Sequence, residues 1–126
     1  MTAYALAHLR GRSPHPDIVT YLERIQATLD PFHGRFVIHG GPAEVVEGAW
    51  PGSVVLIGFP DVARAREWYA SPAYQDILSL RTDHIDGDVI LVEGVGPDYD
   101  PVERADKLRA ANPHGYRADL GQRPTA

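Results

Sequence analysis

Two histidines and one arginine are the residues of this sequence best suited to acid–base chemistry. His8 lies in an apolar segment near the beginning of the chain, and Arg35 and His39 lie four residues apart in another. Histidine gains and loses protons near neutral pH, so His8 is a candidate general base or acid and His39 a candidate assistant. Arg35 can hold a carboxylate or a developing oxyanion with its fork of donors. The alternative is structural: both histidines would be hydrogen-bonded interface residues, and Arg35 would pair with Glu47 or Glu93.

Four further residues carry an aromatic ring or a charge that could contact a ligand: Tyr4, Trp50, Arg81 and Glu93. Tyr4 and Trp50 could stack on a planar molecule, although aromatic residues at an interface more often serve packing. Arg81 could bind an anionic group, or it could form an ion pair with Asp83 or Asp88. These four side chains are therefore candidate substrate contacts beside the three candidate catalytic residues.

No metal site and no cofactor are expected. The chain has no cysteine, which excludes thiolate ligands and disulfides. Asp83, His84 and Asp86 lie in one short segment, but no second histidine stands at a supporting spacing, so we interpret the segment as a solvated turn. His15 and His114 are assigned no role. The sequence contains no P-loop, dinucleotide-binding glycine motif or nucleophile elbow; a haem held by a cavity histidine is a minor alternative.

The candidate residues belong to alternating strand and helix patterns. Short apolar runs predict four strands, at residues 4–9, 35–39, 53–59 and 88–94. An apolar stripe from Ile18 to Leu29 predicts a helix that starts near Pro16 and ends before Pro31. Residues 62–69 and 72–81 predict a second helix in two pieces. The resulting β-α-β-β-α-β order predicts an α+β, ferredoxin-like fold, in which a four-stranded antiparallel sheet carries both helices on one face.

The period-two alternation of the strands assigns side chains to the two faces of this sheet. One face combines apolar residues with most of the polar candidates: Tyr4, Leu6, His8, Arg35, Val37, His39, Val89, Leu91 and Glu93. We expect this surface to point away from the helices. A surface that is so apolar is rarely left bare on a soluble monomer. The sequence therefore predicts a homodimer, in which a second copy covers this face, closes a dimeric α/β barrel and encloses a cavity lined by the polar residues.

Several segments resemble the domain-of-unknown-function family 1330: Gly34–Val37 with Gly40-Gly41, Glu47-Gly48, Phe59-Pro60, Trp68–Gln75 with Arg81, and Asp88–Gly94. The resemblance covers about residues 3 to 95. It implies a ferredoxin-like homodimer of the dimeric α/β-barrel superfamily with a pocket beside the sheet, and it implies no settled activity. Relatives in that superfamily include cofactor-free monooxygenases, muconolactone isomerases, polyketide cyclases and haem enzymes. The chain departs from the family pattern at His33, where a glycine is usual, and in its C-terminal tail.

The chain has 126 residues and a net charge of −5. These values limit the domain organisation and the partners that can be expected. Residues 1–95 would form the ferredoxin-like domain, and residues 96–126 a C-terminal extension with a short helix and a flexible or partner-docked tail. No basic block predicts nucleic-acid binding. The longest apolar stretch, Val54–Phe59, is too short for a membrane span. The N-terminus lacks a signal-peptide pattern, and the absence of cysteine favours a reducing cytoplasm.

Two functional hypotheses follow. In the first, a small organic molecule, planar or bearing a carbonyl group, binds in a cavity at the dimer and is transformed by a cofactor-free isomerase, cyclase or monooxygenase. In the second, the dimer is not catalytic, and it sequesters a metabolite or binds a protein partner through its tail.

Overall fold

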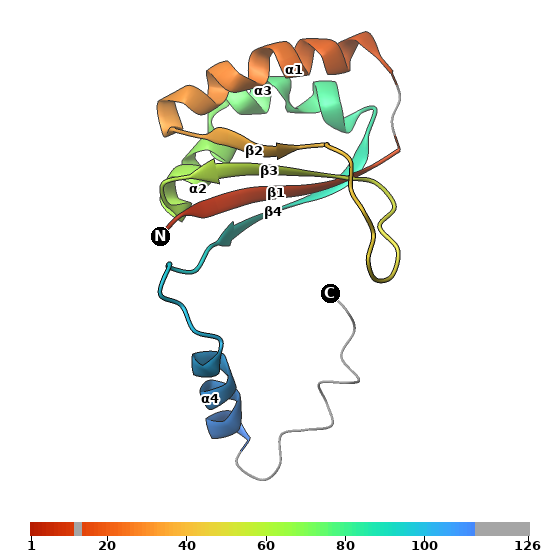
Figure 1. Ribbon diagram of the computed structural model, residues 1–126. Coiled ribbons are helices and arrows are strands. Elements are labelled where there is room, and N and C mark those ends of the chain that lie inside the picture. The colour runs from red at the N-terminus through yellow and green to blue at the C-terminus, as the bar shows by residue number, and fades with distance from the viewer. Residues whose placement is uncertain (12–13, 113–126) are drawn as a thin grey trace. The chain divides into compact units, whose positions relative to one another are not determined.

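Residues 1–11 and 14–112 are described by the computed structural model (Figure 1). Its elements follow in the order β1 (Ala3–Arg10), α1 (Pro16–Leu29), a 3-10 turn η1 (Asp30–Phe32), β2 (Arg35–His39), β3 (Ser53–Phe59), α2 (Val62–Ala70), α3 (Pro72–Thr82), β4 (Asp86–Glu93) and α4 (Val102–Ala111). The chain divides into two compact units, residues 1–95 and the residues from 96 onward. The described part of the second unit contains α4, which has no buried residue.

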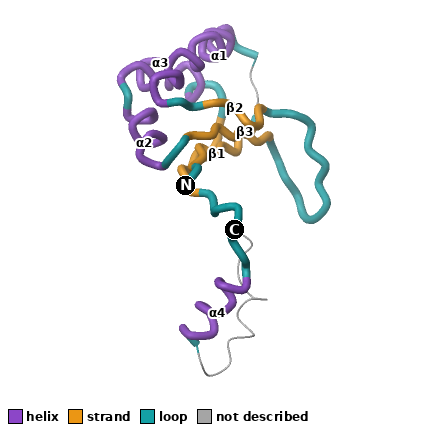
Figure 2. Tube along the Cα trace, turned by 60° about the vertical axis from the view of Figure 1, so that its left-hand side comes forward, coloured by secondary structure: helices purple, strands orange, loops and turns teal. Residues whose placement is uncertain are grey.

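The strands form one antiparallel sheet in the order β2-β3-β1-β4. In Figures 1 and 2, α1, α2 and α3 all lie on the same side of this sheet. The loop of residues 40–52 between β2 and β3 projects beyond the strand ends (Figure 2). This arrangement confirms the predicted α+β, ferredoxin-like fold with its four antiparallel strands.

Local sequence signals set the helix boundaries. His15 precedes Pro16 in extended backbone, and its Nδ1 accepts a hydrogen bond of 3.0 Å from the backbone N–H of Asp17, which caps α1. Asp61 caps α2 in the same way, and the backbone N–H of Arg64 lowers the pKa of its carboxyl group. Ser71 ends α2 and caps α3, so the second helix has the two pieces that the sequence predicts.

His33 has a left-handed backbone, with φ of 59°, at the end of η1. This conformation costs little for glycine and is unfavourable for other residues, which is consistent with the glycine that the family resemblance leads us to expect at this position. The next residue, Gly34, is required for a different reason. A Cβ atom there would lie 2.7 Å from both Leu29 Cδ2 and Phe59 Cε1, so any larger residue would push the end of α1 away from β3.

The core lies between the sheet and the helices. Its largest fully buried side chains are Trp68, Leu29 and Ile77. The indole N–H of Trp68 donates a hydrogen bond of 3.0 Å to Thr28 Oγ1, so the polar atom of this large side chain is satisfied inside the core. Ala3, Ala5 and the alternate residues of β3 form the floor of the core.

The strand pairing corrects two face assignments made from the sequence. Phe36 pairs with Ile57 but Ile38 pairs with Leu56, so β2 contains a β-bulge at Val37. Beyond the bulge the alternation is inverted, and His39 pairs with Val55 on the helix-facing side of the sheet. The prediction that His39 shares a face with His8 and Arg35 is therefore wrong.

The second correction concerns β4. Glu93 pairs with Ala3 and Leu91 with Ala5, and both alanines belong to the buried, helix-facing side of β1. Glu93 is therefore on the helix side, where it is exposed at the sheet edge, and the prediction that it belongs to the outer face is wrong. An apolar strand with no polar alternation does not reveal its inward face, so only the register with β1 decides it.

The outer face of the sheet is the one opposite α1, α2 and α3, and it carries several large apolar side chains. It is defined by Tyr4, Leu6, His8, Val37, Ile38, Leu56, Ile90 and Val92. Ile90 is 53% exposed and Val37 is 58% exposed.

None of the described helices is long and apolar enough to cross a bilayer.

Candidate functional site

A cavity lies between the sheet and the helices of the first unit. Its inner part has a volume of about 80 Å³ and is lined mainly by apolar side chains of β1, β3, α1 and α3. Apart from Trp68, whose N–H is bonded to Thr28, the lining residues with polar side-chain groups are Tyr21, His39, Tyr74 and Arg81. A buried water needs roughly 10–15 Å³ of such volume, so the inner part has room for several waters or for one small organic group.

Arg81 is the unusual member of this wall. It is 7% exposed, and among the described residues it forms no ion pair, so the predicted partners Asp83 and Asp88 are not bound to it. Its guanidinium carbon lies 5.8 Å from the centre of the Tyr21 ring. Burial alone would lower the pKa of Arg81, but its electrostatic interactions and hydrogen bonding with Tyr21 and Tyr74 raise it overall. The cavity therefore contains a permanent positive charge that no carboxylate of the described residues neutralises.

The hydroxyl groups of Tyr21 and Tyr74 lie 2.8 Å apart in a buried hydrogen bond. Burial raises the pKa of Tyr21 well above its ordinary value, and Tyr74 raises it further, although Arg81 acts in the opposite sense. Tyr21 therefore keeps its proton at every physiological pH. The two hydroxyls add neutral hydrogen-bonding groups beside the guanidinium, which is the combination that binds an oxyanion.

His39 lies where the inner cavity meets an outer hollow. It lines both, and five apolar residues are also common to the two: Leu9, Ile18, Leu22, Val55 and Ile85. The outer hollow has a volume of about 360 Å³. The imidazole of His39 stacks on Phe36 with ring centres 4.3 Å apart, and the residue is exposed. His39 can therefore exchange protons with solvent while it faces a ligand that enters the cleft.

His8 lies on the outer face, away from this cavity. Its Nε2–H donates to the carbonyl oxygen of Pro51 at 2.9 Å, Arg10 lies 3.4 Å from its Nδ1, and its ring packs 4.5 Å from Trp50. Arg10 also pairs with Asp88 at 2.8 Å. Both ring nitrogens of His8 are thus engaged, so its basic lone pair is not directed at an open space.

Arg35 is exposed on the same outer face, beside Tyr4, in a shallow hollow of about 300 Å³. His8 and Arg35 pair with opposite ends of β3, at Val54 and Gly58. Four residues of strand correspond to about 13 Å, and two strand spacings of about 4.8 Å each add to the separation. One protomer therefore does not bring His8 and Arg35 to a common substrate. Of the seven candidate residues, His39 and Arg81 are the two that line the cavity on the helix side. On the outer face, His8 contacts Trp50 and Arg35 lies beside Tyr4.

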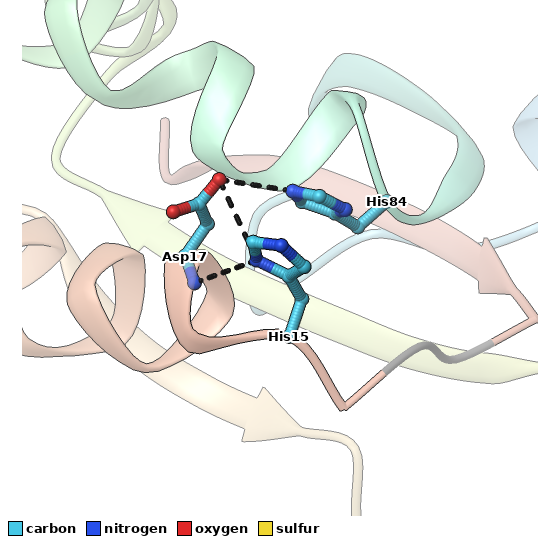
Figure 3. Close-up of side chains that lie close together, drawn as sticks. All are labelled: His15, Asp17 and His84. Carbon is cyan, nitrogen blue, oxygen red and sulfur yellow. Dashed lines mark hydrogen bonds and ion pairs between the residues drawn. The ribbon is translucent and has the colours of Figure 1, made fainter.

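A separate polar cluster joins α1 to the end of α3. His84 Nε2 lies 3.0 Å from a carboxylate oxygen of Asp17, and His15 stacks on His84 with ring centres 3.7 Å apart (Figure 3). Sequence reasoning missed this cluster because His84 and Asp17 are separated by 67 positions. The only available signal was the pair of His15 and Asp17 at a helix start, which by itself indicates a cap.

The chain is a ferredoxin-like α+β protein with a cavity on the helix side of its sheet. The chain belongs to the family described as a domain of unknown function, DUF1330, whose model matches residues 2–95. This match confirms the resemblance found in the sequence. No curated protein sequence matches the chain.

Solved structures similar to this chain share its fold. RPA0582, a protein of unknown function from Rhodopseudomonas palustris, is 19% identical with a TM-score of 0.59, over 76% of this chain and 84% of that one. A variant of SnoaB, a cofactor-independent oxygenase from Streptomyces nogalater, is 13% identical with a TM-score of 0.55, over 79% and 98%. A dimeric ferredoxin-like protein of unknown function from Jannaschia is 15% identical with a TM-score of 0.52, over 75% and 100%. At these identities the similarity establishes the fold.

Proposed function

We propose that the protein binds a small organic molecule with a carboxylate, or with a carbonyl group that becomes an enolate, in the cavity between sheet and helices. The observation that carries this proposal is the buried guanidinium of Arg81, which has no acidic partner among the described residues. A buried cation is costly unless an anion neutralises it. A bound anion or a developing oxyanion would supply that charge.

We propose further that His39 transfers a proton during a reaction that needs no cofactor. His39 would remove a proton from the carbon next to the substrate carbonyl, and the electron pair would move onto the carbonyl oxygen. Arg81 and the hydroxyl groups of Tyr21 and Tyr74 would stabilise the resulting enolate. Return of the proton to another carbon would give an isomerisation, attack of the enolate on a second carbonyl a cyclisation, and reaction with O₂ an oxygenation. The similarity to SnoaB, described as a cofactor-independent oxygenase, supports the last option for this fold.

The protein would act as a homodimer in the cytoplasm. A second copy on the outer face would cover Val37, Ile38, Ile90 and Val92, which are all at least 40% exposed in the single chain. The dimeric ferredoxin-like protein from Jannaschia has the same fold, which supports this assembly. His8, Arg35, Tyr4 and Trp50 would then belong to the interface. Sedimentation velocity at micromolar concentration tests the assembly, and a lone subunit would contradict it.

Fluorescence of Trp68 offers a direct test of ligand binding, because Trp68 lines the inner cavity. Replacing the other tryptophan, Trp50→Phe, leaves Trp68 as the only tryptophan of the chain, so excitation at the red edge of the absorption band reports on it alone. Titration with aromatic and alicyclic keto acids is expected to quench or shift this emission. Arg81→Met should weaken the binding at least about tenfold, since it removes a charge-assisted contact, whereas the exposed arginine variant Arg24→Met should have no effect.

Proton transfer is tested by NMR in deuterium oxide with a ligand found in this way. We expect the protein to exchange the carbon-bound proton next to the carbonyl, and His39→Gln to abolish exchange while binding is retained. The exposed His33→Gln variant is the control. Binding without any exchange by the parent protein would support the alternative of a non-catalytic metabolite-binding dimer. No binding of any anionic or carbonyl ligand at millimolar concentration would overturn the proposal.

A further inference from the structure

The cluster of His15, Asp17 and His84 combines three metal-ligating side chains from distant parts of the chain. His15 precedes α1, Asp17 lies in its first turn, and His84 follows α3. One ligand atom from each lies within 4.8 Å of the other two. Figure 3 shows both imidazole rings on the same side of the Asp17 carboxylate. The fold therefore gathers two imidazoles and one carboxylate at a single point.

The distances within the cluster suit a small divalent ion. Bonds of about 2.0–2.1 Å in a tetrahedral site place neighbouring ligand atoms about 3.4 Å apart. The carboxylate oxygen of Asp17 lies 3.0 Å from His84 Nε2 and 3.5 Å from His15 Nδ1. Two of the distances between ligand atoms are thus already close to those of a tetrahedral site, and both involve the same carboxylate oxygen of Asp17.

The orientation of the rings is the part that must change on binding. The two imidazoles are nearly parallel, with an angle of 16° between their planes. A ring nitrogen binds a metal through a lone pair in the plane of the ring, so the rings must tilt apart. The Nδ1 atom of His15 would also exchange the hydrogen bond from Asp17 N–H for a metal bond. The side chain of His15 is 42% exposed, which leaves its ring space to turn.

The three residues of the cluster are half-buried, and residues next to them in the sequence line the outer hollow. Pro14, Ile18 and Ile85 line this hollow, and each is the sequence neighbour of a cluster residue. An ion can therefore reach the cluster from solvent. Three protein ligands leave one tetrahedral position for water or another small ligand.

We propose that His15, Asp17 and His84 bind one divalent transition-metal ion, for which Zn²⁺ is the representative. Two imidazoles with one carboxylate favour Zn²⁺ and its neighbours in the first transition row over Mg²⁺ or Ca²⁺, which prefer oxygen ligands. The ion would fasten the start of α1 to the turn after α3. This site is independent of the proposed function in the cavity, because Arg81 and His39 contribute nothing to it.

Calorimetric titration of the untagged, EDTA-treated protein with Zn²⁺ tests the site. We expect one ion per chain, with binding weakened at least about tenfold in Asp17→Asn and in His84→Ala. His15→Ser is the most informative variant, since serine is a good helix cap and retains the fold while it removes the ligand. His8→Ala and His33→Ala remove histidines elsewhere and should bind Zn²⁺ as the parent does.

Cobalt(II) provides a second measurement that reports geometry. An intense visible absorption band, lost in His15→Ser and His84→Ala, would show tetrahedral coordination by these residues. The proposal is overturned if Zn²⁺ does not bind at micromolar concentration. It is also overturned if binding survives in His15→Ser and His84→Ala but is lost in His8→Ala, because the ion would then bind elsewhere. A variant that unfolds is identified by circular dichroism, and Asp17→Asn, which conserves shape, then decides.

Discussion

Replacing Arg81 by methionine separates a ligand-binding role from a structural one. Arg81 is 7% exposed and carries its charge within an apolar wall. A structural arginine would be held by a carboxylate, and its loss would leave that carboxylate buried and unpaired, at a cost of about 3–5 kcal/mol. No such partner is bound to Arg81 among the described residues. We therefore expect the Arg81→Met variant to fold and to be about as stable as the parent.

The magnitude follows from opposing contributions. The variant loses the interaction of the guanidinium with the Tyr21 ring, whose centre is 5.8 Å away, for about 1 kcal/mol. It also loses a favourable charge in the last turn of α3, worth about 0.5–1 kcal/mol. Against these losses, the variant avoids the desolvation of the guanidinium, which disfavours the charge in the native protein. The hydroxyls of Tyr21 and Tyr74 still bind each other. The free energy of unfolding should therefore stay within about 1 kcal/mol of the parent value.

Urea unfolding followed by circular dichroism measures this difference, with both proteins analysed at the same slope. A change of 1 kcal/mol corresponds to about 4 °C in melting temperature for a domain of this size. Arg24→Met serves as the control, because Arg24 is exposed on α1. A loss of more than about 3 kcal/mol on Arg81→Met would refute the reasoning, since it would show that the native structure depends on this cation without any ligand.

Four other predictions concern the fold and its assembly. The raised pKa of Tyr21 keeps this hydroxyl protonated in the native state, whereas the unfolded chain loses the proton above about pH 10. Above that pH, the free energy of unfolding measured from urea midpoints should fall by about 1.4 kcal/mol per pH unit. The Tyr21→Phe variant should lack this component of the pH dependence. His33→Gly relieves a left-handed residue and should raise the melting temperature by a few degrees, worth about 0.5–1 kcal/mol; a decrease would contradict the strain argument. Gly34→Ala places a Cβ at 2.7 Å from two core atoms and should lower the free energy of unfolding by about 1–3 kcal/mol in urea titration. An unchanged midpoint would contradict this prediction, because it would mean that the neighbouring core side chains move aside without cost. Ile90→Arg charges the outer face, where Ile90 is 53% exposed, and should convert a dimer to monomers in sedimentation velocity, whereas Val19→Arg on the exposed side of α1 should leave the assembly intact.

The helices were predictable because each has a strong local signal. The stripe from Ile18 to Leu29 and the helical patterns of residues 62–69 and 72–81 act within a few residues, and the structure has the corresponding helices. The last strand differs by two residues at its start, Asp86 instead of Asp88, which is the usual uncertainty of strand ends in a polar segment. The fold class followed from the order of elements.

The candidate site was predicted less well, because face assignments depend on pairing. The bulge at Val37 moves His39 to the helix side, and no glycine or proline marks it in the sequence. The Val89–Glu93 strand is apolar on both faces, so alternation could not orient Glu93. Arg81 was expected to be either a ligand contact or an ion-pair partner. The structure buries it, and none of the acidic residues that the structure describes forms an ion pair with it.

By itself the sequence determined the α+β class, the order of the strands and helices, and the family, since these depend on short-range patterns and on motifs that are contiguous in the chain. Only the tertiary structure decided which side chains meet. Arg81 and His39 line one cavity, and His84 reaches His15 and Asp17, because strand register and helix packing connect residues that lie dozens of positions apart. A one-residue shift of register exchanges the two faces of a strand, and periodicity along a single strand carries no information about its partner.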